Sequence, residues 1–300
     1  MKVTEACGCQ AASQTLDPSA PIGIFDSGIG GLTVARAVLD LLPRERVVYF
    51  GDTARVPYGN KSQETVRRYS REISQFFVNL GVKMIVAACN TSTAAAWDTI
   101  TETFCGPAVG VVEPGAMAAV AATREGKVGV IGTRSTIASE AYNRALLRLD
   151  PSVRVWSKAC PLFVPLAEEG WADDPVTQLV AERYLSPLVA EGVDVIILGC
   201  THYPLLYRTI QSVVGPDVAL VNSAAETAKA VGALLAESEL LSPCGGGRPS
   251  DFCASDDIEG FQRHHERIVG GSEARFHLLT DFDNPPESLA RNSMRTGTTQ

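Results

Sequence analysis

Short apolar runs alternate with amphipathic helical patterns along most of the chain. The runs lie at 21–25, 46–50, 82–90, 107–112, 127–133, 153–160 and 193–200, and the clearest helical patterns at 32–42, 62–80, 114–123, 175–190 and 204–214. Continuously apolar strands are buried on both faces, which is typical of parallel strands joined by helical crossovers. The pattern therefore predicts an α/β fold with mostly parallel sheets.

Both ends of the chain depart from this alternation of strands and helices. Residues 1–19 carry no clear periodicity and are predicted to form a flexible extension. From about Ser242 the segment "SPCGGGRPS" is rich in turn-forming residues, 251–279 are predicted to add a strand and a helix, and the polar segment 281–300 is predicted to be disordered. We expect neither end to hold the chemistry.

Composition and charge narrow the functional class. With 300 residues, 45% apolar and 20% charged, the chain suits two globular domains of modest size. Its net charge of −8, without any block of Lys and Arg, disfavours nucleic acid as the primary ligand. No apolar stretch reaches the roughly 20 residues that cross a bilayer, and the first twenty residues lack the apolar core of a secretory signal. We expect a cytoplasmic enzyme or binding protein that does not associate with membranes.

Eight cysteines are spread along the chain without a C-x-x-C pair or a Cys–His spacing of zinc type. We therefore expect no structural metal site. In a reducing cytosol these cysteines are better interpreted as free thiols than as disulfides.

Two of the cysteines, Cys89 in "VAACNTS" and Cys200 in "VIILGCTHY", end apolar runs in the same way. Ligands of open parallel sheets bind beyond the carboxyl ends of the strands, and other reactive or polar residues collect at these ends too. If the two halves of the chain face one another, one cleft would be lined by Asp26, Ser27, Tyr58, Gly59, Cys89, Asn90, Thr91, Thr133, Cys200, Thr201 and His202.

Two thiols at equivalent strand ends suggest acid–base chemistry on both faces of one carbon. Cys89 stands at the start of a predicted helix, and Pro204 occupies the first turn of the helix predicted behind Cys200, so both sulfurs are expected near positive helix ends. A helix start lowers a thiol pKa from about 8.5 toward neutrality, so one sulfur could remove a proton while the other delivers one. Removing an amino-acid α-proton by a thiolate is uphill by roughly 16 kcal/mol, so fixed donors must hold the substrate carboxylate in a dry site. The candidate donors are Ser27, Asn90, Thr91 and Thr201, with Asp26 assisting Cys89 and His202 assisting Cys200.

The segment "DSGIGG" after the first strand does not match the dinucleotide motif G-x-G-x-x-G, because residue 33 is Thr. Its glycines instead expose backbone N–H groups at a helix start, which suits a carboxylate and hence a small acidic substrate. No Lys stands at a strand end in these motifs, which disfavours pyridoxal chemistry, and we expect no cofactor.

Five segments in order, "FDSGIGGLTV", "VPYG", "ACNTS", "CPLFVPLAEEG" and "LGCTHYPLL", resemble the cofactor-independent glutamate racemases. The resemblance runs from about Ile22 to Ala230, with a weaker tail to about Leu279. It implies two similar α/β domains related by pseudo-twofold symmetry, with the active site between them. The first would comprise 20–113 together with 223–280, and the second 114–222.

The resemblance also implies roles for individual residues. Cys89 would deprotonate D-glutamate and Cys200 L-glutamate, and Glu168 with His202 would assist Cys200. Substrate-binding residues would be Asp26, Ser27, Tyr58, Gly59, Asn90, Thr91, Thr133, Thr136, Thr201 and His202. The implied protein is an isomerase that supplies D-glutamate for peptidoglycan, and thus for cell wall biogenesis and cell shape, with a homodimer as one assembly that it allows. The chain departs from the family by having Asn222-Ser223 where members usually have Asp-Ser.

Three alternatives remain open on the sequence. One is a racemase of the same superfamily that acts on aspartate or a hydantoin, although chain length and "CTHYPLL" favour glutamate. Another is a cysteine-based redox or hydrolytic protein. A redox protein would need the two sulfurs close enough to form a disulfide, whereas a hydrolase would need only one of the two cysteines. The third is a protein that sequesters a partner such as a topoisomerase.

Overall fold

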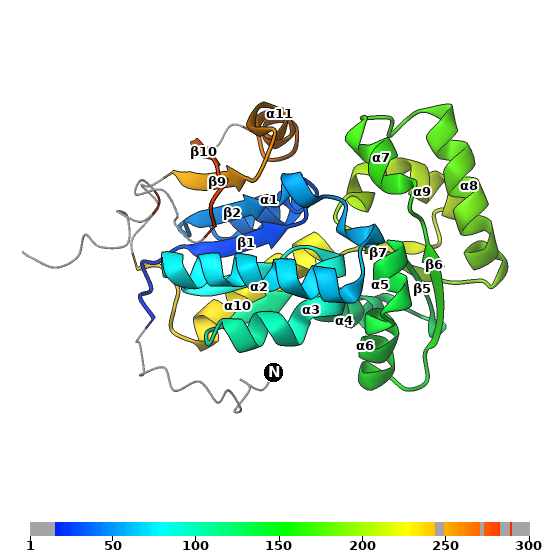
Figure 1. Ribbon diagram of the computed structural model, residues 1–300. Helices are drawn as coiled ribbons and strands as arrows, with labels where there is room; N and C mark the ends of the chain where they lie inside the picture. The colour runs from blue at the N-terminus through cyan, green and yellow to red at the C-terminus, as the bar shows by residue number, and fades with distance from the viewer. Residues whose placement is uncertain (1–15, 244–248, 271–272, 283–288, 290–300) are drawn as a thin grey trace, which may run out of the picture.

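The computed structural model describes residues 16–243, 249–270, 273–282 and 289, and it contains two separate parallel β-sheets (Figure 1). We call the elements packed around the larger sheet the first lobe and those around the smaller sheet the second lobe. All strand pairs in both sheets are parallel. The predicted α/β class with mostly parallel sheets is confirmed.

The first lobe is a three-layer sandwich. Its six-stranded sheet has the order β10-β9-β2-β1-β3-β4, formed by β1 (Ile22–Asp26), β2 (Val47–Gly51), β3 (Met84–Ala87), β4 (Ala108–Gly110), β9 (Ser250–Ala254) and β10 (Ala274–Leu278). One face packs against α1 (Leu32–Leu41), α10 (Ser223–Glu237) and α11 (Ile258–Ile268). The other face packs against α2 (Gln63–Leu80) and α3 (Asn90–Thr103).

The second lobe repeats this plan on a smaller scale. Its four-stranded sheet has the order β6-β5-β7-β8, formed by β5 (Lys127–Gly132), β6 (Arg154–Ala159), β7 (Val195–Gly199) and β8 (Ala219–Asn222). One face packs against α4 (Val112–Ala122) and α6 (Ala141–Leu149), and the other against α7 (Phe163–Glu168), α8 (Pro175–Ala190) and α9 (Tyr207–Val214). The short helix α5 (Arg134–Ala138) follows β5.

The two sheets share one topology. Strands β2-β1-β3-β4 of the first lobe occur in the same spatial order as β6-β5-β7-β8 of the second. β3 is therefore the counterpart of β7, and the cysteines that follow these two strands occupy equivalent positions. The sequence pattern predicts equivalent positions for the two thiols, and the strand order that the two sheets share explains this equivalence.

Local sequence signals fix several helix ends. The Ser62 side chain accepts a hydrogen bond from the Thr65 N–H at the start of α2, and Gly81, with φ of +70°, ends that helix. Asn222, the residue that departs from the family pattern, caps α10 through its side-chain oxygen, which accepts from the Ala224 N–H at 3.0 Å. The amide oxygen provides the acceptor that a helix start needs.

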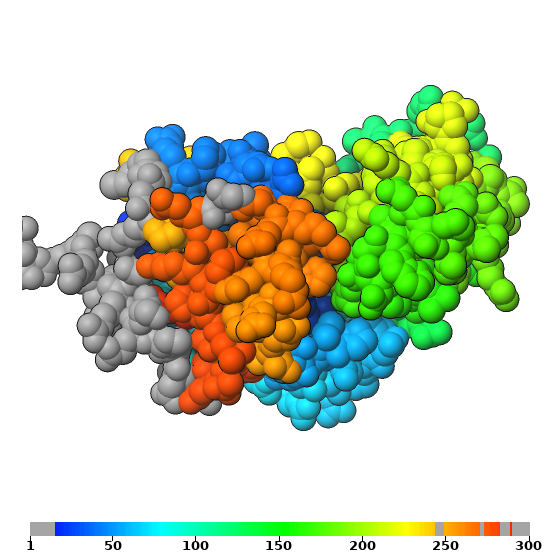
Figure 2. Space-filling view, turned by 90° about the horizontal axis from the view of Figure 1, so that it is seen from above, coloured from blue at the N-terminus to red at the C-terminus, as the bar shows by residue number. Residues whose placement is uncertain are grey.

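The chain passes between the lobes twice. It leaves the first lobe near the start of α4 and returns after β8, where α10 packs on the first sheet. The domain boundaries at 113/114 and 222/223 remain predictions. Seen from above, the C-terminal residues of the first lobe, in orange, lie beside the green second lobe (Figure 2). At this contact an Arg267 Nη atom lies 3.5 Å from the Ala167 carbonyl oxygen.

The C-terminal segment contributes more structure than the sequence pattern indicates. It supplies two strands, β9 and β10, and a helix, where one strand and one helix are predicted. Within the predicted tail 281–300, Phe282 packs edge-on against Phe50 at 5.1 Å between ring centroids, and Leu289 is buried. Residues 1–15 of the predicted extension, 244–248 and most of that tail lie outside the described residues. No described helix is long and apolar enough to span a membrane.

Candidate active site

A cavity of about 520 Å³ lies at the carboxyl ends of both sheets. Both candidate sulfurs line it, as do all other predicted site residues except Asp26 and Thr136, which lie directly behind its wall. The lining residues from the prediction are Ser27, Tyr58, Gly59, Cys89, Asn90, Thr91, Thr133, Glu168, Cys200, Thr201 and His202. The structure thus brings residues that are up to 175 positions apart in sequence (Ser27 to His202) to one site.

Two glycines allow the lobes to approach closely at this cavity. A Cβ added to Gly30 would lie 2.3 Å from Thr201 Oγ1 and 2.6 Å from His202 Nδ1, and one added to Gly59 would lie 2.7 Å from Thr133 Cβ. Any side chain at these positions would push the lobes apart. Gly30 and Gly59 thus have a packing role, which for Gly30 adds to the exposed N–H groups that the sequence suggests for "DSGIGG".

Cys89 is the N-cap residue of α3 and is 5% exposed. Its sulfur accepts a hydrogen bond from the Ser92 N–H at 3.4 Å. Burial, and next the charge of the nearby Asp26 carboxylate, raise the pKa of Cys89 to about 11. The expectation that the helix start lowers this pKa is therefore wrong, because desolvation and a like charge outweigh the helix end.

Cys200 has a different polar partner. Its sulfur lies 3.8 Å from His202 Nδ1, and His202 Nε2 lies 3.0 Å from Glu168 Oε1. Burial opposes a charge on the His202 ring, but the hydrogen bonds to Cys200 and Glu168 outweigh it and raise the pKa of His202 to about 10. Burial likewise opposes the charge of Glu168, yet the hydrogen bond to His202 lowers the pKa of this carboxyl. At neutral pH an imidazolium therefore links the carboxylate to the sulfur.

Cys200 also differs from Cys89 in its backbone. A turn and the 3₁₀ helix Tyr203–Leu206 follow it, and α9 begins only at Tyr207. Pro204 lies in the first turn of this 3₁₀ helix rather than in an α-helix directly behind the thiol. The prediction of two sulfurs at two α-helix starts is correct for Cys89 and wrong for Cys200.

Three threonine hydroxyls join the lobes beside the cavity. Thr91 Oγ1 lies 3.1 Å from Thr133 Oγ1 and 3.3 Å from Thr136 Oγ1, and the latter two are 3.0 Å apart. On the opposite side, Thr201 Oγ1 donates to Asp26 Oδ1 at 3.4 Å. The two contacts of Thr91 and the contact between Thr201 and Asp26 cross between the lobes, so the positions of these hydroxyls depend on how the lobes meet.

Asn90 presents a donor without a protein partner. Its Oδ1 accepts a hydrogen bond from the Tyr142 hydroxyl at 2.6 Å, whereas its buried Nδ2 has no partner among the described residues. A buried unpaired amide N–H group is costly unless a ligand or water accepts from it. Tyr142, which the sequence analysis does not identify, therefore orients the amide so that Nδ2 is left for a ligand.

Tyr58 is held from behind by a charged network. Its hydroxyl donates to Asp52, which also pairs with Arg55 at 2.6 Å and accepts from Ser255 Oγ at 3.0 Å. Burial and then the Asp52 charge keep the pKa of Tyr58 well above its usual value, so the phenol stays neutral. This network fixes the loop that carries Tyr58 and Gly59.

Sequence reasoning missed two kinds of lining residue. Arg134, directly after Thr133, is an exposed guanidinium on the cavity, and among its described lining residues no other Lys or Arg occurs. The apolar part of the wall comes from Val56, Pro57, Pro161, Leu162, Val164, Pro165 and Tyr184. The position of Arg134 next to a predicted site residue could have indicated it, whereas the apolar wall carries no chemical signature in sequence.

Within the described ranges there is no group of three or more His, Cys, Asp or Glu side chains that could hold a metal ion. The available chemistry is acid–base chemistry by two thiols, an imidazolium and two carboxylates around a space suited to a small molecule.

Comparison with known proteins agrees with this geometry. The model of the Asp/Glu/hydantoin racemase family matches residues 31–231. A glutamate racemase from Geobacter metallireducens is 53% identical over 254 residues, covering 85% of this chain and 94% of that protein. The structure resembles glutamate racemase isoform RacE1 from Bacillus anthracis, with a TM-score of 0.84 and 37% identity over 88% of this chain and 98% of that one.

A second solved structure is glutamate racemase from Francisella tularensis in complex with D-glutamate. It has a TM-score of 0.83 and 34% identity, covering 89% of this chain and 99% of that one. The resemblance to glutamate racemases drawn from the sequence motifs is thereby confirmed, and the chain belongs to the aspartate/glutamate/hydantoin racemase family of isomerases.

Proposed function

We propose that this protein interconverts L-glutamate and D-glutamate by proton transfer at Cα between two cysteines. The observation that carries the proposal is that Cys89 and Cys200 follow equivalent strands of the two sheets and line one cavity. The names of the relatives, and the D-glutamate in one related structure, support glutamate as the substrate.

Substrate recognition uses the polar groups that the cavity leaves available. The unpaired Asn90 Nδ2 and the hydroxyls of Thr91 and Thr201 are the candidates to hold the α-carboxylate, and these three residues are almost fully buried. Arg134 at the exposed edge supplies a positive charge for the side-chain carboxylate. The remaining proposed contacts are Asp26, Ser27, Tyr58, Gly59, Thr133, Thr136 and His202.

In the L-to-D direction, the Cys200 thiolate takes the α-proton while the Cys89 thiol delivers its proton to the opposite face. The C–H bond breaks on one side as a new one forms on the other, so no redox partner is required. The pKa of about 11 keeps the proton on Cys89 at neutral pH, and the His202 imidazolium, held by Glu168, donates a hydrogen bond to the Cys200 sulfur.

The D-to-L direction uses the same groups with the proton on the other sulfur. Cys89 acts as the base, with Asp26 positioned to assist it, and the Cys200 thiol is the acid. By this proposal the enzyme supplies D-glutamate for peptidoglycan in the cytoplasm and needs no cofactor. A homodimer is the proposed assembly.

The competing function with the most support is racemisation of aspartate or a hydantoin, because the matching family model covers all three substrates. The 44–53% identity to several glutamate racemases favours glutamate. A redox or hydrolytic thiol function finds less support, because each sulfur has its own acid–base partner.

The test is incubation of the purified full chain with L-glutamate in heavy water without added cofactor. We expect D-glutamate that carries solvent deuterium at Cα, detected by proton NMR and chiral chromatography. Parallel incubations with L-aspartate and a 5-substituted hydantoin should give at most slow turnover. A requirement for pyridoxal phosphate, or faster turnover of aspartate than of glutamate, would overturn the proposal.

A further inference from the structure

The guanidinium of Arg55, which follows β2, lies against two aromatic rings. Its central carbon is 4.1 Å from the ring centroid of Tyr69 on α2 and 5.0 Å from that of Phe282 in the C-terminal segment. The Arg55 side chain is 19% exposed. Aromatic faces attract a cation, and the attraction is stronger where water is excluded. Two segments that lie far apart in the sequence therefore cover one positive charge.

The same guanidinium starts a series of contacts that reaches the catalytic cavity. Arg55 Nε lies 2.6 Å from Asp52 Oδ2, and this fully buried carboxylate accepts a hydrogen bond from the Tyr58 hydroxyl. Tyr58 lines the cavity together with the other residues of the loop 56–60. Phe282 is not among the described lining residues, so any influence that it has on the cavity passes through such contacts.

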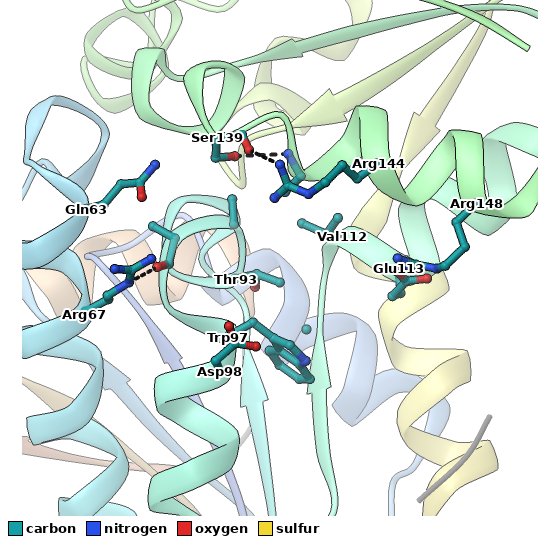
Figure 3. A pocket seen from close by; sticks show the side chains of 14 residues that line it. Gln63, Arg67, Thr93, Trp97, Asp98, Val112, Glu113, Ser139, Arg144 and Arg148 are labelled. Carbon is teal, nitrogen blue, oxygen red and sulfur yellow. Dashed lines mark hydrogen bonds and ion pairs between the residues drawn. The ribbon is translucent and has the colours of Figure 1, made fainter. Parts of the chain in front are cut away.

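Helix α2 contributes two of the groups around Arg55. Tyr69 is the nearer ring, and the Glu72 carboxylate pairs with Arg55 Nη1. This helix is bonded to α3 through Arg67, whose Nε donates to a carbonyl of α3 at 2.9 Å (Figure 3). Tyr69 and Glu72 are therefore fixed by the packing of the lobe, whereas the position of Phe282 depends on the C-terminal segment.

The C-terminal segment is attached to the first lobe on both sides of Phe282 in the sequence. The Leu279 N–H donates to a carbonyl of β9 at 2.9 Å, and the Leu279 and Leu289 side chains are each 2% exposed. Both leucines belong to the apolar cluster that contains Phe50, against which the Phe282 ring packs. Burial of these side chains stabilises the segment, so apolar packing keeps the Phe282 ring against Arg55.

The network and its cover belong to different parts of the chain. The match to the racemase family model ends at residue 231, so Asp52, Arg55 and Tyr58 lie within it and Phe282 lies outside. The contacts that hold the loop are thus in the region that the family model matches, and the C-terminal segment of this chain adds a cover to them.

Loss of the Phe282 ring would weaken this series of contacts. The attraction between Arg55 and Asp52 falls as water reaches the pair, because the effective dielectric constant rises. A less firmly held Asp52 carboxylate would in turn hold the Tyr58 hydroxyl less firmly, and the loop 56–60 would gain conformational freedom. Substrate binding would then have to restrict that freedom, which lowers affinity.

We propose that Phe282 is a positioning residue for the catalytic cavity. By covering Arg55, it keeps the Asp52 carboxylate and the loop that carries Tyr58 and Gly59 in the arrangement that binds substrate. The effect on substrate binding rests on the proposed racemase function, whereas the effect on the loop is independent of it.

The test is Phe282→Ala in the full chain, with two readouts. The KM for glutamate should rise about fivefold with kcat changed by less than about twofold, because binding of substrate and of transition state weakens equally. Hydrogen exchange of the peptide 52–60, followed by mass spectrometry without substrate, should become about tenfold faster, because the loop opens more often. Phe282→Tyr keeps the ring and should restore both values. Should the alanine variant not fold, Phe282→Leu replaces it, because leucine keeps most of the apolar volume without the ring.

The matched control is Phe276→Ala, which truncates another partly buried aromatic residue of the C-terminal segment. Phe276 packs on the opposite face of the first sheet, against Phe252 and Phe261. Its loss should lower the thermal unfolding temperature but leave KM and the exchange of the peptide 52–60 unchanged. The control thus separates a general loss of stability from the loss of the cover over Arg55.

A double-mutant cycle tests whether Phe282 acts through Arg55. Arg55→Met removes the charge but keeps an unbranched side chain, and in this background Phe282→Ala should increase neither KM nor exchange further, because the ring then covers no cation. Additive effects of the two substitutions, an unchanged KM or exchange rate in Phe282→Ala, or equal changes in Phe276→Ala would overturn the proposal. If the wild-type protein does not turn over glutamate, the proposed function fails, and the exchange measurements still decide the role of Phe282.

Discussion

The surroundings of Cys89 and Cys200 differ far more than their positions in the two sheets. Both thiols follow equivalent strands, and both are 5% exposed. Cys89 caps an α-helix and has a buried carboxylate, Asp26, as its charged neighbour. Cys200 is followed by a turn and a 3₁₀ helix and has the ring of His202, backed by Glu168, as its neighbour.

This difference shows which properties follow from topology and which from local sequence. The repeated strand order brings two sulfurs to one cavity, but the neighbouring charges determine where a proton resides. A carboxylate beside Cys89 favours the neutral thiol, whereas the charged group beside Cys200 is the His202 imidazolium. The two thiols therefore have neighbours of opposite charge before any substrate enters.

The largest expected effect comes from removing either sulfur. Cys89→Ser and Cys200→Ser should each lower kcat/KM by on the order of 10³-fold or more, because a hydroxyl is a far weaker acid than a thiol and supplies almost no anionic base near neutral pH. Formation of D-glutamate from L-glutamate, followed by circular dichroism, measures this loss.

The matched control is Cys105→Ser, which changes an exposed cysteine that does not line the cavity. It should retain full activity. Substantial activity in either single-site variant would show that one sulfur suffices and would contradict the two-base proposal.

The second-largest expected effect tests the charged ring beside Cys200. His202→Gln should lower kcat/KM by about 100-fold, because it removes the imidazolium beside Cys200. The two enantiomers have equal free energies, so kcat/KM must fall equally in both directions, and any asymmetry must appear in kcat and KM separately.

The pH profile provides a second readout for the same variant. In the wild-type enzyme His202 is charged below its pKa of about 10, so kcat/KM should fall as pH rises through that value. This fall in kcat/KM at high pH should disappear in His202→Gln and shift to lower pH in Glu168→Gln, where the hydrogen bond that stabilises the imidazolium is lost. The same fall at the same pH in both variants would exclude His202 as its origin.

Much of this site could be predicted from sequence because its residues follow apolar strands. Asp26, Cys89, Thr133 and Cys200 each end such a run or follow it directly, and parallel sheets bring these ends together. Strand β8 and helix α10 were not assigned from the pattern. Strand β8 escapes prediction because its residues are only partly buried, so its apolar signal in the sequence is weak.

The electrostatics could not be predicted in the same way. The local pattern of a strand followed by a helix suggested a lowered pKa for both thiols, whereas burial and Asp26 raise that of Cys89. Asp26 is 63 positions away in sequence, and its effect depends on a packing contact between β1 and β3. Tyr142, which orients Asn90, belongs to the other lobe and has no sequence signal that links the two.

A smaller change should isolate the effect of Asp26 on its own side of the site. Asp26→Asn should lower the pKa of Cys89 from about 11 by about one unit, because it removes the nearby negative charge and leaves the burial. The rate of Cys89 alkylation by iodoacetamide against pH, in a Cys200→Ser background, measures this shift. The same substitution should lower kcat/KM by about tenfold, since Asp26 also accepts hydrogen bonds from Gly28 and Thr201.

Glu168→Gln provides the comparison for that experiment, because it removes a carboxylate from the Cys200 side. It should leave the alkylation profile of Cys89 unchanged. A pKa shift of Cys89 that is equally large in both variants would mean that this thiol responds equally to both carboxylates, and the contrast between the two thiols would then not hold.

The smallest expected effect concerns Arg134, which belongs to neither thiol. This exposed guanidinium at the cavity edge should attract the acidic substrate without taking part in proton transfer. Arg134→Gln should therefore raise the KM for glutamate by about two- to fivefold with little change in kcat, which is the scale of an exposed ion pair. Because such a pair is screened, added salt should raise the wild-type KM and reduce the difference between the two proteins.

Arg183→Gln, on the exposed surface of α8, is the matched control and should leave KM unchanged. A fall in kcat as large as the rise in KM would instead place Arg134 among the groups that act on the transition state, and the two thiols with their partners would then not account for all of the charge stabilisation.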